Sequence, residues 1–216
     1  MCLHSIVVDP GRPERMWVAI SSAGVFYTED AGATWGARNK GIRAYFFPED
    51  KFPEVGQCVH KLVSHPSRPD VLYAQNHAGN GQGGVYRSDN GGLEWRTIEE
   101  GLPAVFGFPI AVHPHQPDTI YVIPEKADSE RVTPEGKPTV YRSREGGKTW
   151  EPKRQGLPDG AWLNVLRQAM CTDSASPAGV HFGTSTGQLF GSVDEGKTWR
   201  MLADCLPPIY SVRAVC

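Results

Sequence analysis

Ser143-Arg-Glu-Gly-Gly-Lys-Thr-Trp150 is one of four copies of an eight-residue pattern that decides the fold. The others are Thr28-Glu-Asp-Ala-Gly-Ala-Thr-Trp35, Ser88-Asp-Asn-Gly-Gly-Leu-Glu-Trp95 and Ser192-Val-Asp-Glu-Gly-Lys-Thr-Trp199. Each copy has a hydroxyl residue first, an acid or amide third, glycine fifth and tryptophan last. A pattern that returns about every 50 residues indicates a fold built from repeated units.

The residues around each copy repeat as well. A short apolar strand precedes each pattern, and a proline-rich turn occurs earlier in three of the units, at 9–14, 65–70 and 113–118. The pattern of each unit therefore predicts four antiparallel strands, and four such strands form one blade of a β-propeller. We expect a single all-β propeller domain over residues 1–216, with blades at 3–40, 57–99, 106–154 and 161–204 and an extra strand at 208–216.

The repeated pattern is predicted to be a hairpin turn with a structural role. Its acid or amide can accept backbone hydrogen bonds, its glycine allows backbone angles that other residues resist, and its tryptophan can pack between sheets. A catalytic acid would be needed once and not in every blade. The residues concerned are Asp30, Gly32, Trp35, Asn90, Gly92, Trp95, Glu145, Gly147, Trp150, Asp194, Gly196 and Trp199.

Composition limits the function classes. The chain has 216 residues, with 22 basic and 24 acidic residues and a net charge of -2, which argues against a nucleic-acid partner. No apolar run is long enough for a membrane helix. The five cysteines are scattered without a Cys-x-x-Cys pair, so we expect a reducing, cytoplasmic setting, no metal site and no cofactor.

The repeated pattern resembles the Asp-box, or BNR, repeat of propellers such as sialidases, xyloglucanase-type glycosidases, sortilin-type receptors and photosystem II assembly proteins. The chain is most similar to bacterial BNR-repeat proteins that are often labelled glycosyl hydrolases, and it resembles their C-terminal part. The stretches at 54–61, 75–77, 106–109 and 165–170 carry this closer likeness. The resemblance implies a ring of more than four blades, so we expect a piece of a longer propeller, a ring closed by a homodimer, or an unusually small ring.

Several polar residues occupy positions where the inner strands of a propeller should be apolar. Inner strands line the central channel, and ligands often bind at its mouth. These residues therefore form a candidate ligand site, although they could instead satisfy buried backbone groups or ordered water. Cys58, two residues from His60, is either a small buried hydrophobe or an activated thiol. The candidate site comprises Gln57, His60, Asn76, His77, Arg167 and Gln168.

Two functions follow from this pattern. The first and preferred one is a non-catalytic binding or assembly scaffold with a glycan or protein ligand at the channel mouth. The alternative is a glycosidase-like hydrolase, which would need a pair of carboxylates across a cleft. The arginine-isoleucine-proline motif of sialidases is absent, and Asp70 and Asp118 belong to the repeated turn. Glu54 is left as the one weak catalytic candidate.

Overall fold

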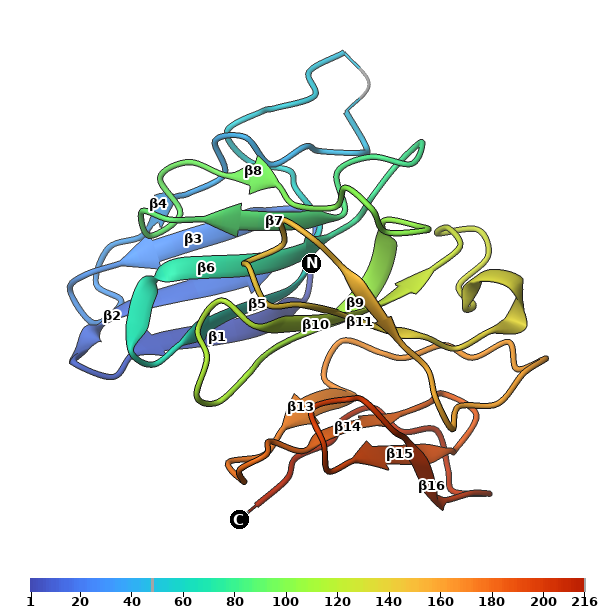
Figure 1. Ribbon diagram of the computed structural model, residues 1–216. Coiled ribbons are helices and arrows are strands. Elements are labelled where there is room, and N and C mark those ends of the chain that lie inside the picture. The colour runs from blue at the N-terminus through green and yellow to red at the C-terminus, as the bar shows by residue number, and fades with distance from the viewer. Residues whose placement is uncertain (48, 216) are drawn as a thin grey trace.

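The computed structural model describes residues 1–47 and 49–215, which form four separate four-stranded antiparallel sheets (Figure 1). The described chain contains no α-helix, and its one short 3-10 helix spans Pro134–Gly136. The all-β propeller fold class predicted from the repeats is therefore confirmed. The strands are β1 (Leu3–Asp9), β2 (Arg12–Ile20), β3 (Gly24–Thr28), β4 (Gly36–Ala37), β5 (Val59–His65), β6 (Arg68–Asn76), β7 (Val85–Ser88), β8 (Arg96–Thr97), β9 (Phe106–Val112), β10 (Ile120–Glu125), β11 (Val140–Ser143), β12 (Glu151–Lys153), β13 (Met170–Thr172), β14 (Val180–Gly183), β15 (Leu189–Ser192) and β16 (Arg200–Ala203).

Within each sheet the strands pair in the order in which they follow along the chain. The first strands of neighbouring sheets, β1, β5, β9 and β13, contact one another in that sequence and form the inner layer. The four sheets are the four blades, and each lies within one of the predicted segments. Figure 1 shows the fourth blade at the lower end of the view, away from the first.

The repeated turns share one set of hydrogen bonds. In the first, the Gly32 amide donates to Thr28 Oγ1 at 3.0 Å and the Thr34 amide donates to Asp30 Oδ1 at 2.9 Å. The second and fourth turns repeat both bonds, and the third repeats the glycine bond. All four turns are thus held by their own hydroxyl, and three of them also by the acid or amide, whereas Glu145 of the third turn accepts a bond from the Thr149 side chain.

The tryptophans join one blade to the next. Three of them donate the indole hydrogen to a backbone carbonyl of the preceding blade, whereas Trp35 donates to Gly32 of its own turn at 3.1 Å and is 42% exposed. The three bonds run from Trp95 to Arg38, from Trp150 to Ile98 and from Trp199 to Lys153, at 2.8, 2.9 and 3.1 Å.

The hydrophobic core lies between blades. One cluster fills the space between the first and second blades, another that between the second and third, and a third that between the third and fourth. Gly41 has a φ of +96°, and a side chain there would meet the Trp95 carbonyl, 2.3 Å from a Cβ. Gly156 meets Trp199 in the same way. Glycine is therefore required where the chain passes under the next tryptophan.

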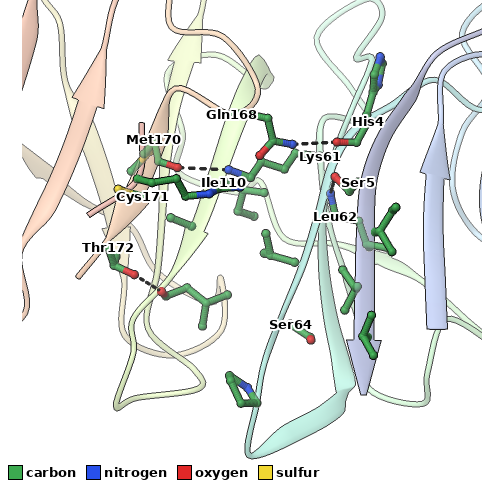
Figure 2. A pocket seen from close by; sticks show the side chains of 18 of the residues that line it. His4, Ser5, Lys61, Leu62, Ser64, Ile110, Gln168, Met170, Cys171 and Thr172 are labelled. Carbon is green, nitrogen blue, oxygen red and sulfur yellow. Dashed lines mark hydrogen bonds between the residues drawn. The ribbon is translucent and has the colours of Figure 1, made fainter. Parts of the chain in front are cut away.

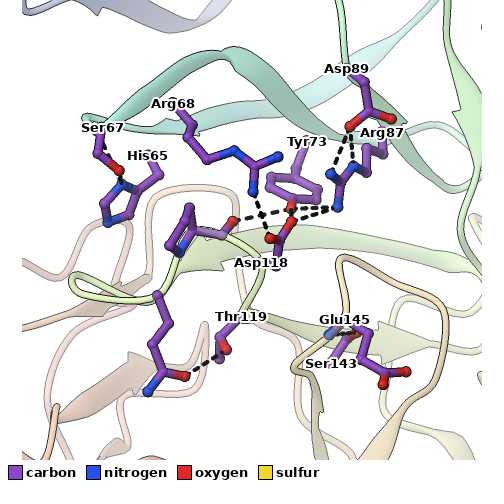
Figure 3. A network of polar contacts seen from close by, with 12 residues as sticks. His65, Ser67, Arg68, Tyr73, Arg87, Asp89, Asp118, Thr119, Ser143 and Glu145 are labelled. Atoms are coloured by element: carbon purple, nitrogen blue, oxygen red, sulfur yellow. Dashed lines mark hydrogen bonds and ion pairs between the residues drawn. The ribbon is translucent and has the colours of Figure 1, made fainter.

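Ion pairs also cross between blades at the proline-rich turns (Figure 3). Arg87 is buried and donates to Asp118 of the third blade at 2.8 Å, and Arg68 donates to the other oxygen of the same carboxylate at 2.6 Å. Arg15 pairs with Asp70 in the equivalent place between the first two blades. Burial alone would raise the pKa of Asp118, but the hydrogen bonds and charges of Arg87 and Arg68 hold it below its usual value. Asp70 and Asp118 therefore serve the joint between blades.

One expectation is corrected at the C-terminal side. The extra strand predicted over 208–216 is not a strand in the described part of the chain: Ser211 makes an isolated parallel bridge with Gln168, and Cys216 lies outside the described residues. The first strand of the fourth blade begins at Met170, inside the predicted segment 161–204. The preceding segment is a loop because its backbone bonds to Glu125 and Thr133 of the third blade.

Candidate functional site

The four inner strands enclose a central channel with a cavity of about 660 Å³ (Figure 2). Apolar side chains of β1, β5 and β9 make up much of its lining. Lys61 and Arg213 are the lysine and arginine that line it, and no Asp or Glu of the described residues does so. The channel lining is therefore largely apolar and carries positive charge at Lys61 and Arg213.

Lys61 of β5 crosses the channel toward β13. Its ammonium donates to the Met170 carbonyl at 3.2 Å, and the residue is 6% exposed. Burial, together with the charge of the nearby Arg213, lowers the pKa of Lys61 to about 8, while Cys171 acts in the opposite sense. Because one hydrogen bond uses one of its three donors, the ammonium can donate to an additional acceptor in the cavity.

Backbone bulges near the start of β1 and β5 determine the direction in which the His4 and His60 side chains point. The pairing register shifts between Leu3 and Ser5 in β1 and between Val59 and Lys61 in β5, so His4 and His60 are the extra residues. A bulge turns a side chain away from the regular alternation. The turned rings each reach the neighbouring blade. His4 Nδ1 lies 2.8 Å from the Val59 carbonyl, and His60 Nδ1 lies 2.7 Å from the Gly107 carbonyl.

Gln168 connects the fourth blade back to the first. Its Nε2 donates to the His4 carbonyl at 2.8 Å, and its own backbone accepts from Val212. Figure 2 shows Gln168 and Lys61 among the residues that line the cavity. Gln168 therefore lines the channel while it holds the two ends of the arc of blades together.

Three ligand-type side chains gather where β5 begins. Cys58, His60 and His77 each present one nitrogen or sulfur, and these atoms lie within 4.8 Å of one another. All three residues are buried, with 9%, 1% and 6% exposure. The His77 amide donates to the Cys58 carbonyl at 2.9 Å, so the two residues face each other across neighbouring segments. None of these three side chains lines the cavity, which they adjoin through Lys61, the neighbour of His60; together with Arg167 we call them the channel mouth.

Aromatic rings and arginines surround the cluster. The Tyr45 and Phe46 rings lie 5.2 and 5.0 Å from the His77 ring, centre to centre. The guanidinium of Arg167 lies 4.7 Å from the Phe108 ring centre, and that of Arg131 lies 5.6 Å from it. Burial lowers the pKa of Arg167, and the charge of Arg131 adds to this effect. The mouth thus combines stacking faces with two cations.

The candidate residues named from the sequence divide into two groups. His60, His77 and Arg167 come together at the channel mouth, and Gln168 lies in the channel. Gln57 and Asn76 instead fix loops, since Gln57 Nε2 donates to Pro53 at 2.7 Å and Asn76 Nδ2 donates to Gly83 at 3.0 Å. For these two the backbone-satisfying role fits the geometry.

Glu54 and Cys58 depart from the reactive roles considered for them. Glu54 is exposed, and its backbone carbonyl accepts a hydrogen bond from Asn39 at 2.9 Å. It lies on a loop outside the cluster. Burial raises the pKa of the Cys58 thiol, so Cys58 is not activated on its own.

Sequence reasoning missed two buried charged residues. Lys61 could have been found, because a lysine between apolar residues of a predicted inner strand is unusual. Glu125 gave no such signal, since it precedes a charged loop. It is fully buried and accepts hydrogen bonds from the Val165 amide and from Asn164, at 3.0 and 3.1 Å. Burial raises the pKa of Glu125 to about 7.

No protein-family model matches the chain, and no curated protein matches it. Solved structures do. An ancestral GH74 enzyme aligns with 94% of the chain at a TM-score of 0.67 and 18% identity, and the GH74 xyloglucanase from Xanthomonas campestris aligns with 92% at 0.61 and 16%. YCF48 from Cyanidioschyzon merolae aligns with 92% at 0.57 and 16%.

The fold is that of a β-propeller. At these identities the likeness concerns the fold and not the function. The chain spans 24% and 29% of the two GH74 structures and 55% of the YCF48 structure. No helix of the described residues is long and apolar enough to span a membrane.

Proposed function

We propose that the protein is a non-catalytic binding scaffold whose central channel receives an extended, acidic segment of a partner protein. The observation that carries this proposal is Lys61, a buried ammonium that lines a cavity without a carboxylate among the described lining residues. A carboxylate from a partner would supply the missing negative charge. Hydrogen bonds to charged groups contribute about 1.5–3 kcal/mol each.

The remaining lining favours an extended peptide. Ile6 and Val8 of β1 lie in the channel lining and are 60% and 45% exposed, so they offer apolar contacts beside the two cations. Ser211 already pairs in parallel with Gln168, which places an extended segment along the inner layer. A partner strand with apolar residues on one face and acidic residues on the other would contact both the apolar lining and the two cations.

Fluorescence anisotropy with a labelled octapeptide of alternating Val and Glu tests this function. The matched Val-Gln peptide is the neutral control. Lys61→Met should weaken binding of the acidic peptide roughly 10- to 100-fold, whereas Lys148→Met, at an exposed site in a repeated turn, should leave it unchanged. Equal affinity for the two peptides, or equal loss in both variants, would refute the proposal.

We further propose that the chain is an Asp-box (BNR) protein of a bacterial cytoplasm. The shared hydrogen bonds of the four turns support the family assignment. The described cysteines are all free, which fits a reducing compartment. Recovery of the protein with these thiols unmodified from a cytoplasmic fraction is the expected result, and disulfide-linked material would contradict it.

Association of two copies through the first blade is a related proposal. This blade exposes the large apolar side chains of Leu3 and Trp35, which are 55% and 42% exposed. Light scattering on a size-exclusion column should give a discrete mass of twice one chain. Trp35→Ala should shift that mass toward one chain, and a monomeric wild type would exclude the homodimer.

The glycosidase alternative has one observation in its favour, the pKa of Glu125 near 7, which suits a general acid. Both oxygens of that carboxylate, however, already accept hydrogen bonds, and the residue is fully buried. A panel of fluorogenic glycosides decides the question. Turnover that is lost in Glu54→Gln or Glu125→Gln would replace the scaffold function with a hydrolase.

A further inference from the structure

We propose that Cys58, His60 and His77 bind a divalent transition-metal ion of the Zn²⁺ type at the channel mouth. Thiolate and imidazole are the ligands that Zn²⁺ prefers in proteins. Their ligand atoms already lie within 4.8 Å of one another and all three residues are buried. This inference does not depend on the proposed partner binding.

Strand geometry explains why the three side chains converge. Cys58 directly precedes β5 and His60 is the bulged residue of that strand, so their convergence follows from the bulge and not from regular strand alternation. The hydrogen bond from His77 to the Cys58 carbonyl sets His77 opposite Cys58. The bulge at His60 then turns its ring, so that it meets the His77 ring edge to face, with centres 5.3 Å apart.

Both rings are in the state that a metal needs. His60 Nδ1 donates to the Gly107 carbonyl, which leaves Nε2 as the unprotonated nitrogen of the neutral ring. A carbonyl that fixes one ring nitrogen in this way is a usual support of metal-binding histidines. His77 Nε2 is buried and has no hydrogen-bond partner among the described residues. It is therefore a buried polar atom that the protein alone leaves unsatisfied.

Charged groups of both signs lie near the cluster. Arg131 and Arg167 lie near it and oppose a cation, whereas Asp128 Oδ2 lies 3.5 Å from His77 Nε2 and favours one. Binding would release the Cys58 proton to solvent as the sulfur–metal bond forms, so the thiolate would supply a second negative charge. Asp128 or a water would then complete a four-coordinate site.

The first blade provides an internal comparison. Cys2 and His4 repeat the spacing of Cys58 and His60, and the Ser21 amide donates to the Cys2 carbonyl at 2.9 Å as the His77 amide does to Cys58. His4 also repeats the bond to the next blade. Serine stands where the second blade has His77. The bond from Nδ1 thus belongs to the joint between blades, and the third ligand is particular to the second blade.

Zinc and cobalt titrations of the full chain test the site. Equilibrium dialysis against ZnCl₂ should give one tightly bound ion per chain, and CoCl₂ should give a sulfur-to-cobalt charge-transfer band and tetrahedral d–d bands. Cys58→Ser and His77→Ser should each weaken zinc binding by on the order of 100-fold or more and remove the charge-transfer or tetrahedral bands. Cys2→Ser, at the matched position of the first blade, should change neither.

His77→Ser keeps the test valid if Cys58→Ser does not fold, because serine is the natural residue at the equivalent place in the first blade. Circular dichroism checks the fold of each variant. Wild-type protein that binds no stoichiometric zinc, cobalt spectra without a sulfur band, or equal loss in Cys2→Ser and Cys58→Ser would each overturn the proposal.

Discussion

Lys61→Met removes a buried ammonium while it keeps the length of the side chain, and it should change how stability depends on pH. The pKa of Lys61 in the folded protein is about 8, below its usual value of 10.5, because the side chain is buried. Between these two pH values the unfolded chain holds the proton and the folded chain does not. The free energy of unfolding therefore rises with pH over this interval.

The magnitude follows from that difference in protonation. One proton contributes about 1.4 kcal/mol for each pH unit over which it is held by the unfolded state alone. From pH 8 to pH 9.5 the wild type should therefore gain up to about 2 kcal/mol that Lys61→Met does not gain. The ionisable groups that act on the ammonium are Arg213, from the C-terminal segment, and the thiol of Cys171 in β13, and both remain in the variant.

Urea unfolding at several pH values between 7 and 9.5 measures this difference. Tryptophan fluorescence and far-ultraviolet circular dichroism must give coincident transitions, so that one free energy describes the change. Lys148→Met is the control, because Lys148 is exposed. A difference between wild type and Lys61→Met that stays constant over the whole pH interval would refute the account of Lys61 as a buried, desolvated ammonium.

Three further predictions concern the joints between blades. Trp95→Phe should cost roughly 1–3 kcal/mol by thermal or urea unfolding, because it removes a bond to the first blade, whereas Trp35→Phe should cost less than about 0.5 kcal/mol. Asp118→Ala should cost roughly 1–2 kcal/mol in the same assay, because it removes one of the two carboxylates that pair with the buried Arg87 and also the pair with Arg68, whereas Asp159→Ala should change stability by less than about 0.5 kcal/mol. Glu125 holds its proton up to a pKa of about 7 in the folded state, so its contribution to stability is present below pH 4.5 and is lost as pH rises through 7. Glu125→Gln should remove this fall in urea titrations between pH 5 and 8.

Each of these predictions has a result that would contradict it. Equal costs for the two tryptophan variants would mean that the indole bonds do not join the blades. An Asp118→Ala cost as small as that of Asp159→Ala would mean that the arginine network is solvated. A pH profile of Glu125→Gln identical to that of the wild type would mean that Glu125 is ionised across the whole interval.

The fold could be predicted because its signal is repeated. Four turns of the same pattern report on four similar environments, so hydrogen bonds such as that from Gly32 to Thr28 recur at each. The start of the fourth blade could not be predicted as well. Its first strand is short because the preceding loop bonds to Glu125, and such a long-range contact leaves no pattern in the local sequence.

The candidate site was predictable where a residue broke a pattern. His60 and His77 stood out as polar residues in apolar surroundings, and both lie at the channel mouth. Their meeting with Cys58 depends on strand register and on a bulge, and spacing along the chain carries neither. Gln57 and Asn76 broke the pattern for another reason, since their amides bond to loop carbonyls.

Binding of the Val-Glu octapeptide as a function of pH tests the central claim most directly, because it joins the channel, Lys61 and the acidic ligand in one measurement. The claim predicts tight binding by the wild type at pH 7, weakening as pH rises through about 8 where Lys61 loses its proton, and weak, pH-independent binding by Lys61→Met. Binding of equal strength at pH 7 and pH 9.5, or binding that Lys61→Met leaves intact, would contradict it.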